Sequence, residues 1–320
     1  MLLKKTRSKQ NKNATFNSLD LFTTTANFLN LAFESKKITA SVLQITQVYP
    51  DNIFQIMKIE GLYIYPIKST KGQKLIEITI LKIGFENDRY LGIANVKNEI
   101  ITARENAELL NIKTEINNNQ LNISYKNETK KIALNKEFQD IELSLFHTSV
   151  AGKIISDELN NWFTALLNSE SKLVKINLNK LRKTNDTAIS FNDVYPIHLI
   201  SRESVAALND KLETPIESNR FRPNIIISGV KAFEEETWTH LIIGECEFKV
   251  VSKTERCSLI TINPHNGVKD KKQEPLRTLA KAFKKDGKVN FGIYLIPIKT
   301  GIIRDSDTLK IKTVGNKEYH

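Results

Sequence analysis

Short runs in which apolar and polar residues alternate make up most of the chain, and clusters of turn residues separate them. A period of two places successive side chains on opposite faces, so each run predicts a half-buried β-strand. In the first half we expect strands at residues 59–64, 75–83 and 89–96, and a hairpin of 121–125 with 130–134. In the second half we expect strands that include Ile225, Leu241, Glu247, Leu259, Phe291 and Leu309.

Two segments carry apolar residues at helical spacing instead. Residues 157–167 follow Ser156, and residues 203–211 lie just after Ser201. A serine at this position accepts a hydrogen bond from the first free N–H groups of a helix, so both segments are predicted as capped helices. Few helices among many short strands favour an α+β, strand-rich fold with two β-barrel-like domains and appended helices.

The first 56 residues differ in character from the rest of the chain. They begin with a basic, polar stretch that contains few acidic residues, as organelle transit peptides do. Met57, however, directly precedes the first predicted strand, which favours Met57 as the true start of the protein. We therefore expect a leader of uncertain status outside the core fold at 1–56, a first β-barrel-like domain at 57–176 and a second domain at 177–320.

The 320 residues carry a formal net charge of +11, and the pI is near 9.4. The lysines are spread along the whole chain and no aromatic-studded basic motif occurs, so nucleic-acid binding is not expected. The charge is better suited to attract an anionic cofactor or an acidic electron donor. No run approaches the roughly 20 apolar residues that a membrane helix needs, which predicts a soluble, cytoplasmic protein without a membrane span.

The chain has two cysteines, Cys246 and Cys257, and no CxxC pair. This count argues for a reducing compartment and against a disulfide framework, structural zinc or an iron–sulfur cluster. Cys246 lies on the apolar face of a predicted strand, which is typical of a small buried side chain. Cys257 follows Arg256, and a neighbouring cation favours the thiolate that binds metals. We expect Cys257 at the start of a strand over residues 258–262, and a buried, inert thiol is the alternative.

A second polar cluster precedes the strand expected at Ile225. Arg220 and Arg222 lie two residues apart, and Asn224 follows them directly before the strand. Two planar guanidinium groups at this spacing suit a multiply charged phosphate, because each offers a fork of donors. Together with the thiol, the cluster indicates a phosphorylated cofactor whose reactive atom is held by sulfur.

Eight short segments occur in order along the chain. They are Tyr-Pro-Ile-Lys-Ser at 65–69, Asp-Arg at 88–89, Thr-Ala-Arg-Glu at 102–105, Pro-Ile-His-Leu-Ile-Ser at 196–201, Arg-Phe-Arg-Pro-Asn at 220–224, Phe-Glu-Glu-Glu-Thr-Trp at 233–238, Arg-Cys at 256–257 and Phe-Gly at 291–292. Together they resemble the two-part MOSC proteins, in which an N-terminal β-barrel-like domain precedes a MOSC domain. This family includes the mitochondrial amidoxime-reducing component and its bacterial counterparts, and the resemblance covers residues 57–313.

The resemblance implies a molybdenum cofactor, a pterin dithiolene that carries molybdenum and a phosphate tail. It implies that Cys257 is the catalytic residue and the protein ligand to molybdenum, which is consistent with a soft thiolate on a thiophilic metal. The implied reaction reduces small N-hydroxylated compounds, such as amidoximes and hydroxylamines, by oxygen removal, with electrons from a separate reductase. The implied cofactor-binding residues are Lys68, Ser69, Arg89 and Arg104 at the pterin and phosphate, and Ser201, Arg222 and Asn224 around the pterin.

Two residues depart from the family pattern. Asn263 stands where the family often has an acidic residue, and His265 has no expected role. An alternative function is a cofactor carrier or sulfur-transfer protein, since MOSC domains also end the molybdenum cofactor sulfurases. Those enzymes add a domain with a pyridoxal lysine, for which 320 residues leave no room. A third possibility is a binding protein that has lost the site, and an intact Cys257 argues against it.

Overall fold

Eight strands form the largest sheet of the structure, a computed structural model that describes residues 57–134, 139–184 and 186–314. In sheet order these strands are β2 (Gln73–Leu75), β1 (Lys58–Ile64), β15 (Ile225–Ser228), β14 (Ile197–Ser201), β18 (Asn290–Lys299), β17 (Cys246–Glu255), β16 (Trp238–Ile243) and β20 (Leu309–Val314). Neighbouring strands pair antiparallel except β14 and β15, which pair parallel. Their buried side chains form a core that includes Leu62, Trp238 and Phe248.

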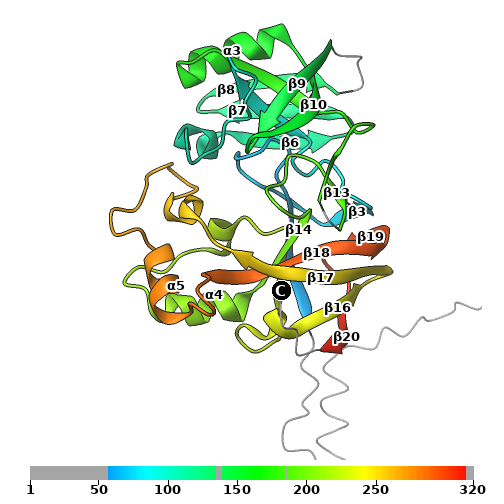
Figure 1. Cartoon of the computed structure of the whole chain (residues 1–320), viewed down its shortest axis with the longest axis vertical. Helices are drawn as coiled ribbons and strands as arrows, with labels where there is room; N and C mark the ends of the chain where they lie inside the picture. The colour runs from blue at the N-terminus through cyan, green and yellow to red at the C-terminus, as the bar shows by residue number, and fades with distance from the viewer. Residues whose placement is uncertain (1–56, 135–138, 185, 315–320) are drawn as a thin grey trace, which may run out of the picture. The chain divides into compact units, whose positions relative to one another are not determined.

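A four-stranded sheet and a three-stranded sheet lie together with helix α3 (Asp157–Leu167), apart from the large sheet (Figure 1). The apolar face of α3 packs with these sheets into a second core, to which Leu159 and Phe163 belong. The four strands are β5 (Leu91–Asn95), β11 (Ser171–Ile176), β10 (Thr148–Ile154) and β9 (Gln139–Leu145); the three are β6 (Lys113–Asn117), β7 (Gln120–Tyr125) and β8 (Glu128–Ala133). Two small sheets join β19 (Gly301–Arg304), β3 (Glu77–Leu81) and β4 (Gly84–Phe85), and β12 (Arg182–Lys183) with β13 (Ala188–Ile189).

The two halves of the chain share sheets. β1 comes from the first half and pairs with β15 from the second, and β19 near the end of the chain pairs with β3. The strand-rich α+β class is confirmed, whereas the domain boundary at residue 176 stays a prediction. The expected leader, residues 1–56, lies outside the described residues. Within the described part of the chain, no helix is long and apolar enough to cross a membrane.

Local sequence signals place two helices and the hairpin correctly. Ser156 accepts a hydrogen bond from the Leu159 N–H at 3.3 Å at the start of α3. Ser201 accepts one from the Ser204 N–H at 3.1 Å at the start of α4 (Arg202–Asn209). The expected hairpin is present as β7 and β8. Helix α5 (Leu276–Ala282) lies where the pattern predicts no helix.

The strand expected over residues 258–262 is wrong. Ser258–Thr261 form the short 3₁₀ helix η4, and Cys257 directly precedes it. A strand would send alternate apolar side chains to one face. Here Ile260 packs into one core, while Leu259 and Ile262 pack into another. The tighter helical turn serves both cores, so tertiary packing overrides the β-branched pattern.

Candidate functional site

One cavity brings together seven of the eight predicted site residues. They arrive from both halves of the chain: the segment after β1, the turn before β5, the segment that follows β5, the loop before β15 and the link between β17 and η4. Segments that are far apart in sequence therefore converge on one space. The seven residues are Lys68, Ser69, Arg89, Arg104, Arg222, Asn224 and Cys257.

Cys257 is an exposed, free thiol in this cavity, whereas Cys246 is buried within β17, as predicted. The Arg104 Nη1 atom lies 3.5 Å from Cys257 Sγ. Arg256 is fixed by other contacts, because its Nη2 donates to the Phe221 carbonyl at 3.1 Å and its guanidinium lies 5.3 Å from the Phe221 ring centroid. Two guanidinium groups thus give the thiol the electropositive surroundings that metal-binding cysteines have.

The ring of Tyr65 contacts two guanidinium groups of the cavity. Its centroid is 4.3 Å from Arg89 Cζ and 4.1 Å from Arg222 Cζ, and its hydroxyl donates to the Pro223 carbonyl at 3.1 Å. Burial raises the pKa of Tyr65 to about 12, although Arg222 and Arg89 oppose that rise. Burial also lowers the pKa of Arg222 to about 10. At neutral pH the phenol is uncharged and the arginines are charged, so this stack holds two cations at the cavity wall.

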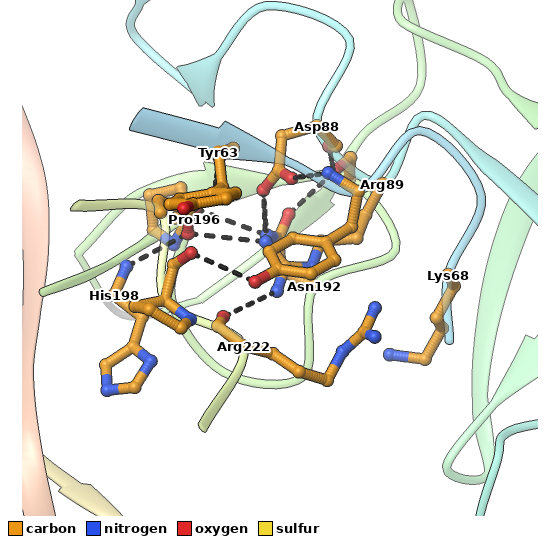
Figure 2. A network of polar contacts seen from close by, with 12 residues as sticks. Tyr63, Lys68, Asp88, Arg89, Asn192, Pro196, His198 and Arg222 are labelled. Atoms are coloured by element: carbon orange, nitrogen blue, oxygen red, sulfur yellow. Dashed lines mark hydrogen bonds and ion pairs between the residues drawn. The ribbon is translucent and has the colours of Figure 1, made fainter. Parts of the chain in front are cut away.

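Asp88 is the buried carboxylate that fixes Arg89 (Figure 2). Its side chain accepts hydrogen bonds from Arg89 Nη1 at 2.5 Å, from the Tyr65 N–H at 2.8 Å and from Asn192 Nδ2 at 3.4 Å. Asn224 Oδ1 accepts a further bond from Arg89 Nη1 at 3.3 Å. Because two acceptors hold the same nitrogen, the guanidinium keeps one orientation. In Figure 2 the charged ends of Lys68 and Arg222 point toward the same space.

Lys68 extends its ammonium group into the cavity from a buried position, with only 5% of the residue exposed. Its Nζ donates to the Phe191 carbonyl at 2.7 Å and to the carboxylate of Asp193, whose other oxygen lies 3.8 Å from Arg104 Nη2. Burial would raise the pKa of Asp193, but the nearby cations, Lys68 first, lower it to about 2. Asp193 is therefore ionised at neutral pH and holds both cations. Sequence reasoning missed Asp193, because it lies outside the eight short segments that carry the resemblance.

Positive charge dominates the lining. Five cationic side chains face two carboxylates, Asp193 and Glu255. Among the described residues, two buried nitrogens of these cations, Arg222 Nη2 and Arg256 Nε, have no hydrogen-bond partner. Donors left over in this way suit a ligand that brings several acceptor oxygens. A thiol beside them adds a soft metal ligand, so the donor set fits a phosphorylated cofactor that carries a thiophilic metal. The five cations are Lys68, Arg89, Arg104, Arg222 and Arg256.

Comparison with known proteins shows the family of this chain. The model of the MOSC N-terminal beta barrel domain matches residues 56–170, and that of the MOSC domain matches residues 186–310. Mitochondrial amidoxime reducing component 2 of Rattus norvegicus is 31% identical over 282 residues, which cover 79% of this chain and 82% of that protein. The chain belongs to the MOSC family. The resemblance predicted from the eight short segments is thereby confirmed.

Two further relatives of this MOSC protein differ in how much of them it covers. Mitochondrial amidoxime-reducing component 1 of Homo sapiens is 30% identical over 243 residues, which cover 70% of this chain and 72% of that protein. A molybdenum cofactor sulfurase of Oryza sativa subsp. japonica is 28% identical over 264 residues, 74% of this chain but 32% of the sulfurase. The similarity thus spans most of an amidoxime reducing component and only a third of the sulfurase.

His198 lines the cavity of this MOSC protein, and sequence reasoning did not identify it as a site residue. Its Nε2 lies 3.4 Å from the Phe291 carbonyl, and burial, reinforced by Arg256 and Arg89, holds the pKa of His198 well below its usual value. The ring is therefore neutral. Gly292 has φ +79°, and a Cβ there would come within 2.7 Å of His198 Nε2. The Phe-Gly segment thus needs its glycine so that strand β18 can approach the buried imidazole.

Ser201 is the predicted site residue that does not line the cavity. It is buried, and its hydroxyl donates to Ser204 Oγ at 2.7 Å. Glu235 Oε1 accepts hydrogen bonds from the Ser201 N–H at 3.1 Å and from Ser204 Oγ at 2.8 Å. These contacts give Ser201 a structural role at the start of α4, and its role at the cofactor stays a prediction. Asn263 and His265 also lie outside the cavity lining, and His265 pairs with the exposed Glu217.

Replacing Glu235 with glutamine should raise the melting temperature more at neutral pH than at pH 4.5. Burial raises the pKa of Glu235 in the folded protein above its ordinary value of 4.5, and Oε2 has no hydrogen-bond partner among the described residues. The folded state therefore binds the proton more tightly than the unfolded chain, so wild-type stability falls as the pH rises from 4.5 through the folded-state pKa. Glutamine does not titrate and escapes that loss. Melting curves of both proteins across this range check the prediction, and a difference that is constant with pH would contradict it.

Proposed function

We propose that this MOSC protein is a molybdenum-cofactor-dependent oxidoreductase that reduces N-hydroxylated compounds such as amidoximes and hydroxylamines. The observation that carries the proposal is the meeting of one exposed thiol and five cations in a single cavity. Similarity over most of the length of proteins named amidoxime reducing components supports the reaction class. The family connection alone leaves the mechanism at Cys257 open, and the geometry supports it independently.

The residues present fit the cofactor. Cys257 Sγ would bind the metal. Lys68, Arg89 and Arg104 would bind the pterin and its phosphate, with Ser69 beside them. Arg222 and Asn224 would hold the pterin. Arg222 Nη2, which has no hydrogen-bond partner in the part of the chain that the structure describes, gives that ligand a donor to use. When bound, the cofactor supplies the two-electron chemistry of oxygen removal.

The remaining work falls to this chain's own side chains. Arg104 lies at the thiol and is held by Asp193, so its charge stays beside the reacting centre. Arg89, fixed by Asp88, and Arg222, stacked on Tyr65, keep the opposite wall rigid before the ligand arrives. Such preorganised charges stabilise an anionic ligand without reorganising. Overall, an amidoxime takes up two electrons and two protons and yields an amidine and water. The electrons come from a separate reductase.

A cofactor carrier or sulfur-transfer protein is the second candidate, and the similarity to the rice sulfurase favours it. A carrier needs the same cradle as an enzyme but must release the cofactor. The two candidates therefore agree on cofactor binding and differ on turnover.

Protein purified from a host that makes the cofactor should contain close to stoichiometric molybdenum and pterin. It should also reduce benzamidoxime to benzamidine with a chemical electron donor, because the cradle and the thiol are both in place. Elemental analysis and product chromatography measure the two properties. Metal with no turnover would favour the carrier, and the absence of both metal and pterin would overturn the proposal. Protein from a host strain unable to make the cofactor is the matched control.

A further inference from the structure

The turn between β9 and β10 is strained. Leu145 pairs with Thr148, so Phe146 and His147 alone form the turn, with φ of 51° and 63°. Both angles lie in the left-handed region, which suits Asn and Gly and which bulkier side chains adopt at a cost. Backbone strain of this kind gathers at active sites and ligand clamps. The turn is therefore a candidate functional element.

Phe146 places its ring over two cations of the cavity. The ring centroid lies 5.2 Å from Lys68 Nζ and 5.1 Å from Arg104 Cζ. Arg104 in turn contacts Cys257 Sγ at 3.5 Å. The strained turn thus delivers an aromatic side chain to the immediate neighbourhood of the thiol.

The ring is not used to fill the core. Phe146 is 44% exposed, while Leu145 and Val150 of the same hairpin are buried in the core beneath it. A second apolar side chain, Val194, is 48% exposed and follows Asp193, the carboxylate that pairs with the same two cations. Exposed apolar groups next to a charged cavity match a ligand with a polar head and a flat apolar body.

We propose that Phe146 is a specificity-determining residue. Its exposed surface contacts the aromatic body of an N-hydroxylated substrate, and the N–OH group of that substrate reaches toward Cys257. Lys68 and Arg104 fix the ring in place through its π-system. The reaction in this proposal rests on the proposed function. The position of the substrate rests on the contacts of the Phe146 ring.

The test compares benzamidoxime with acetamidoxime, which carries a methyl group in place of the aromatic ring. Phe146→Ala should lower the ratio of kcat/KM for benzamidoxime to that for acetamidoxime about three- to tenfold, the usual effect of one lost aromatic contact. Molybdenum and pterin contents should stay at the wild-type level. Phe146→Trp should keep the preference for the aromatic compound. His147→Ala, in the same turn, and Val96→Ala, an exposed apolar residue elsewhere, are controls that should keep the wild-type ratio.

A variant that relieves the backbone strain distinguishes the effect of the Phe146 ring from the effect of the turn conformation. The double variant Phe146→Asn with His147→Gly suits the left-handed conformation, so it should melt higher than wild type and yet lose the preference for benzamidoxime. A ratio that is unchanged both in Phe146→Ala and in the double variant would overturn the proposal. Loss of pterin together with an equal loss on both substrates would also overturn it, and would show that the ring only holds Lys68 and Arg104 for the cofactor.

A binding measurement tests the position of the aromatic body independently of turnover. Calorimetry with benzamidine on the cofactor-loaded protein should give about three- to tenfold weaker binding for Phe146→Ala than for wild type. If the loaded wild-type protein reduces neither amidoxime, the proposed function fails while this comparison still decides the place of the aromatic body. Equal benzamidine affinity in the two proteins would overturn the proposal.

Discussion

Replacing Cys257 with serine should abolish molybdenum retention and turnover while the protein keeps its fold. The thiol is exposed, and the side chain makes no capping hydrogen bond at the start of η4, so little packing is lost. A hydroxyl is a much poorer ligand for a thiophilic metal than a thiolate. Because loss of even an outer-shell partner commonly costs 10- to 100-fold, turnover should fall by at least about 100-fold. Elemental analysis, benzamidoxime turnover and a melting curve measure the three properties.

Cys246→Ala is the matched control for this substitution. Cys246 is fully buried in β17, where it packs with Phe248 and Val250. Removing its sulfur should lower the free energy of unfolding by about 1 kcal/mol through a small cavity, with metal content and turnover unchanged. The two cysteines should thus show opposite profiles: one affects the site and the other affects stability. A Cys257→Ser protein with normal metal and full activity would refute the assignment of the ligand.

The elements that sequence patterns predict correctly are those set by local interactions. Helix α3 begins where Ser156 can cap it, and β7 and β8 alternate across a short polar turn. Residues 258–262 fail because their side chains divide between two cores, which no local pattern encodes. The pairing of β1 with β15 likewise joins residues more than 160 positions apart, so the periodicity of either strand does not predict its partner.

The candidate site divides in the same way. Cys257 and the arginines are recognisable because their chemistry is unusual for a strand end, and short motifs surround them. Asp193, His198 and Tyr65 belong to the site through contacts that only the fold creates: an ion pair to Lys68, a glycine that makes room for an imidazole, and a ring that contacts two guanidinium groups. Ser201 shows the converse. It is predicted at the cofactor from its motif, and the structure gives it a helix cap.

Replacing Asp88 with alanine should destabilise the fold strongly. Asp88 is 2% exposed, and it is the carboxylate that neutralises Arg89, whose side chain is 14% exposed. Without it, a nearly buried guanidinium keeps its charge close to a second one at Arg222, since both lie within 4.3 Å of the Tyr65 ring centroid. Breaking a buried pair on one side costs about 3–5 kcal/mol. For a unit of this size the loss is on the order of 10 °C in Tm, which a melting curve resolves.

Asp140→Ala is the control that isolates burial from charge. Asp140 also pairs with a cation, Lys153 at 2.9 Å, but its side chain is 70% exposed. Exposed ion pairs contribute little, so this variant should melt with the wild type. The melting temperature of Asp88→Asn should fall between those of Asp88→Ala and Asp140→Ala. An amide oxygen can still accept a hydrogen bond from the Tyr65 N–H, but it brings no charge to Arg89. Pterin content should follow the same order, since Arg89 is held in the cavity wall by Asp88. An Asp88→Ala protein as stable as wild type would show that the cradle does not depend on this carboxylate. The remaining acceptors of the Arg89 guanidinium, Asn224 Oδ1 and the Arg222 carbonyl, would then suffice to hold the arginine.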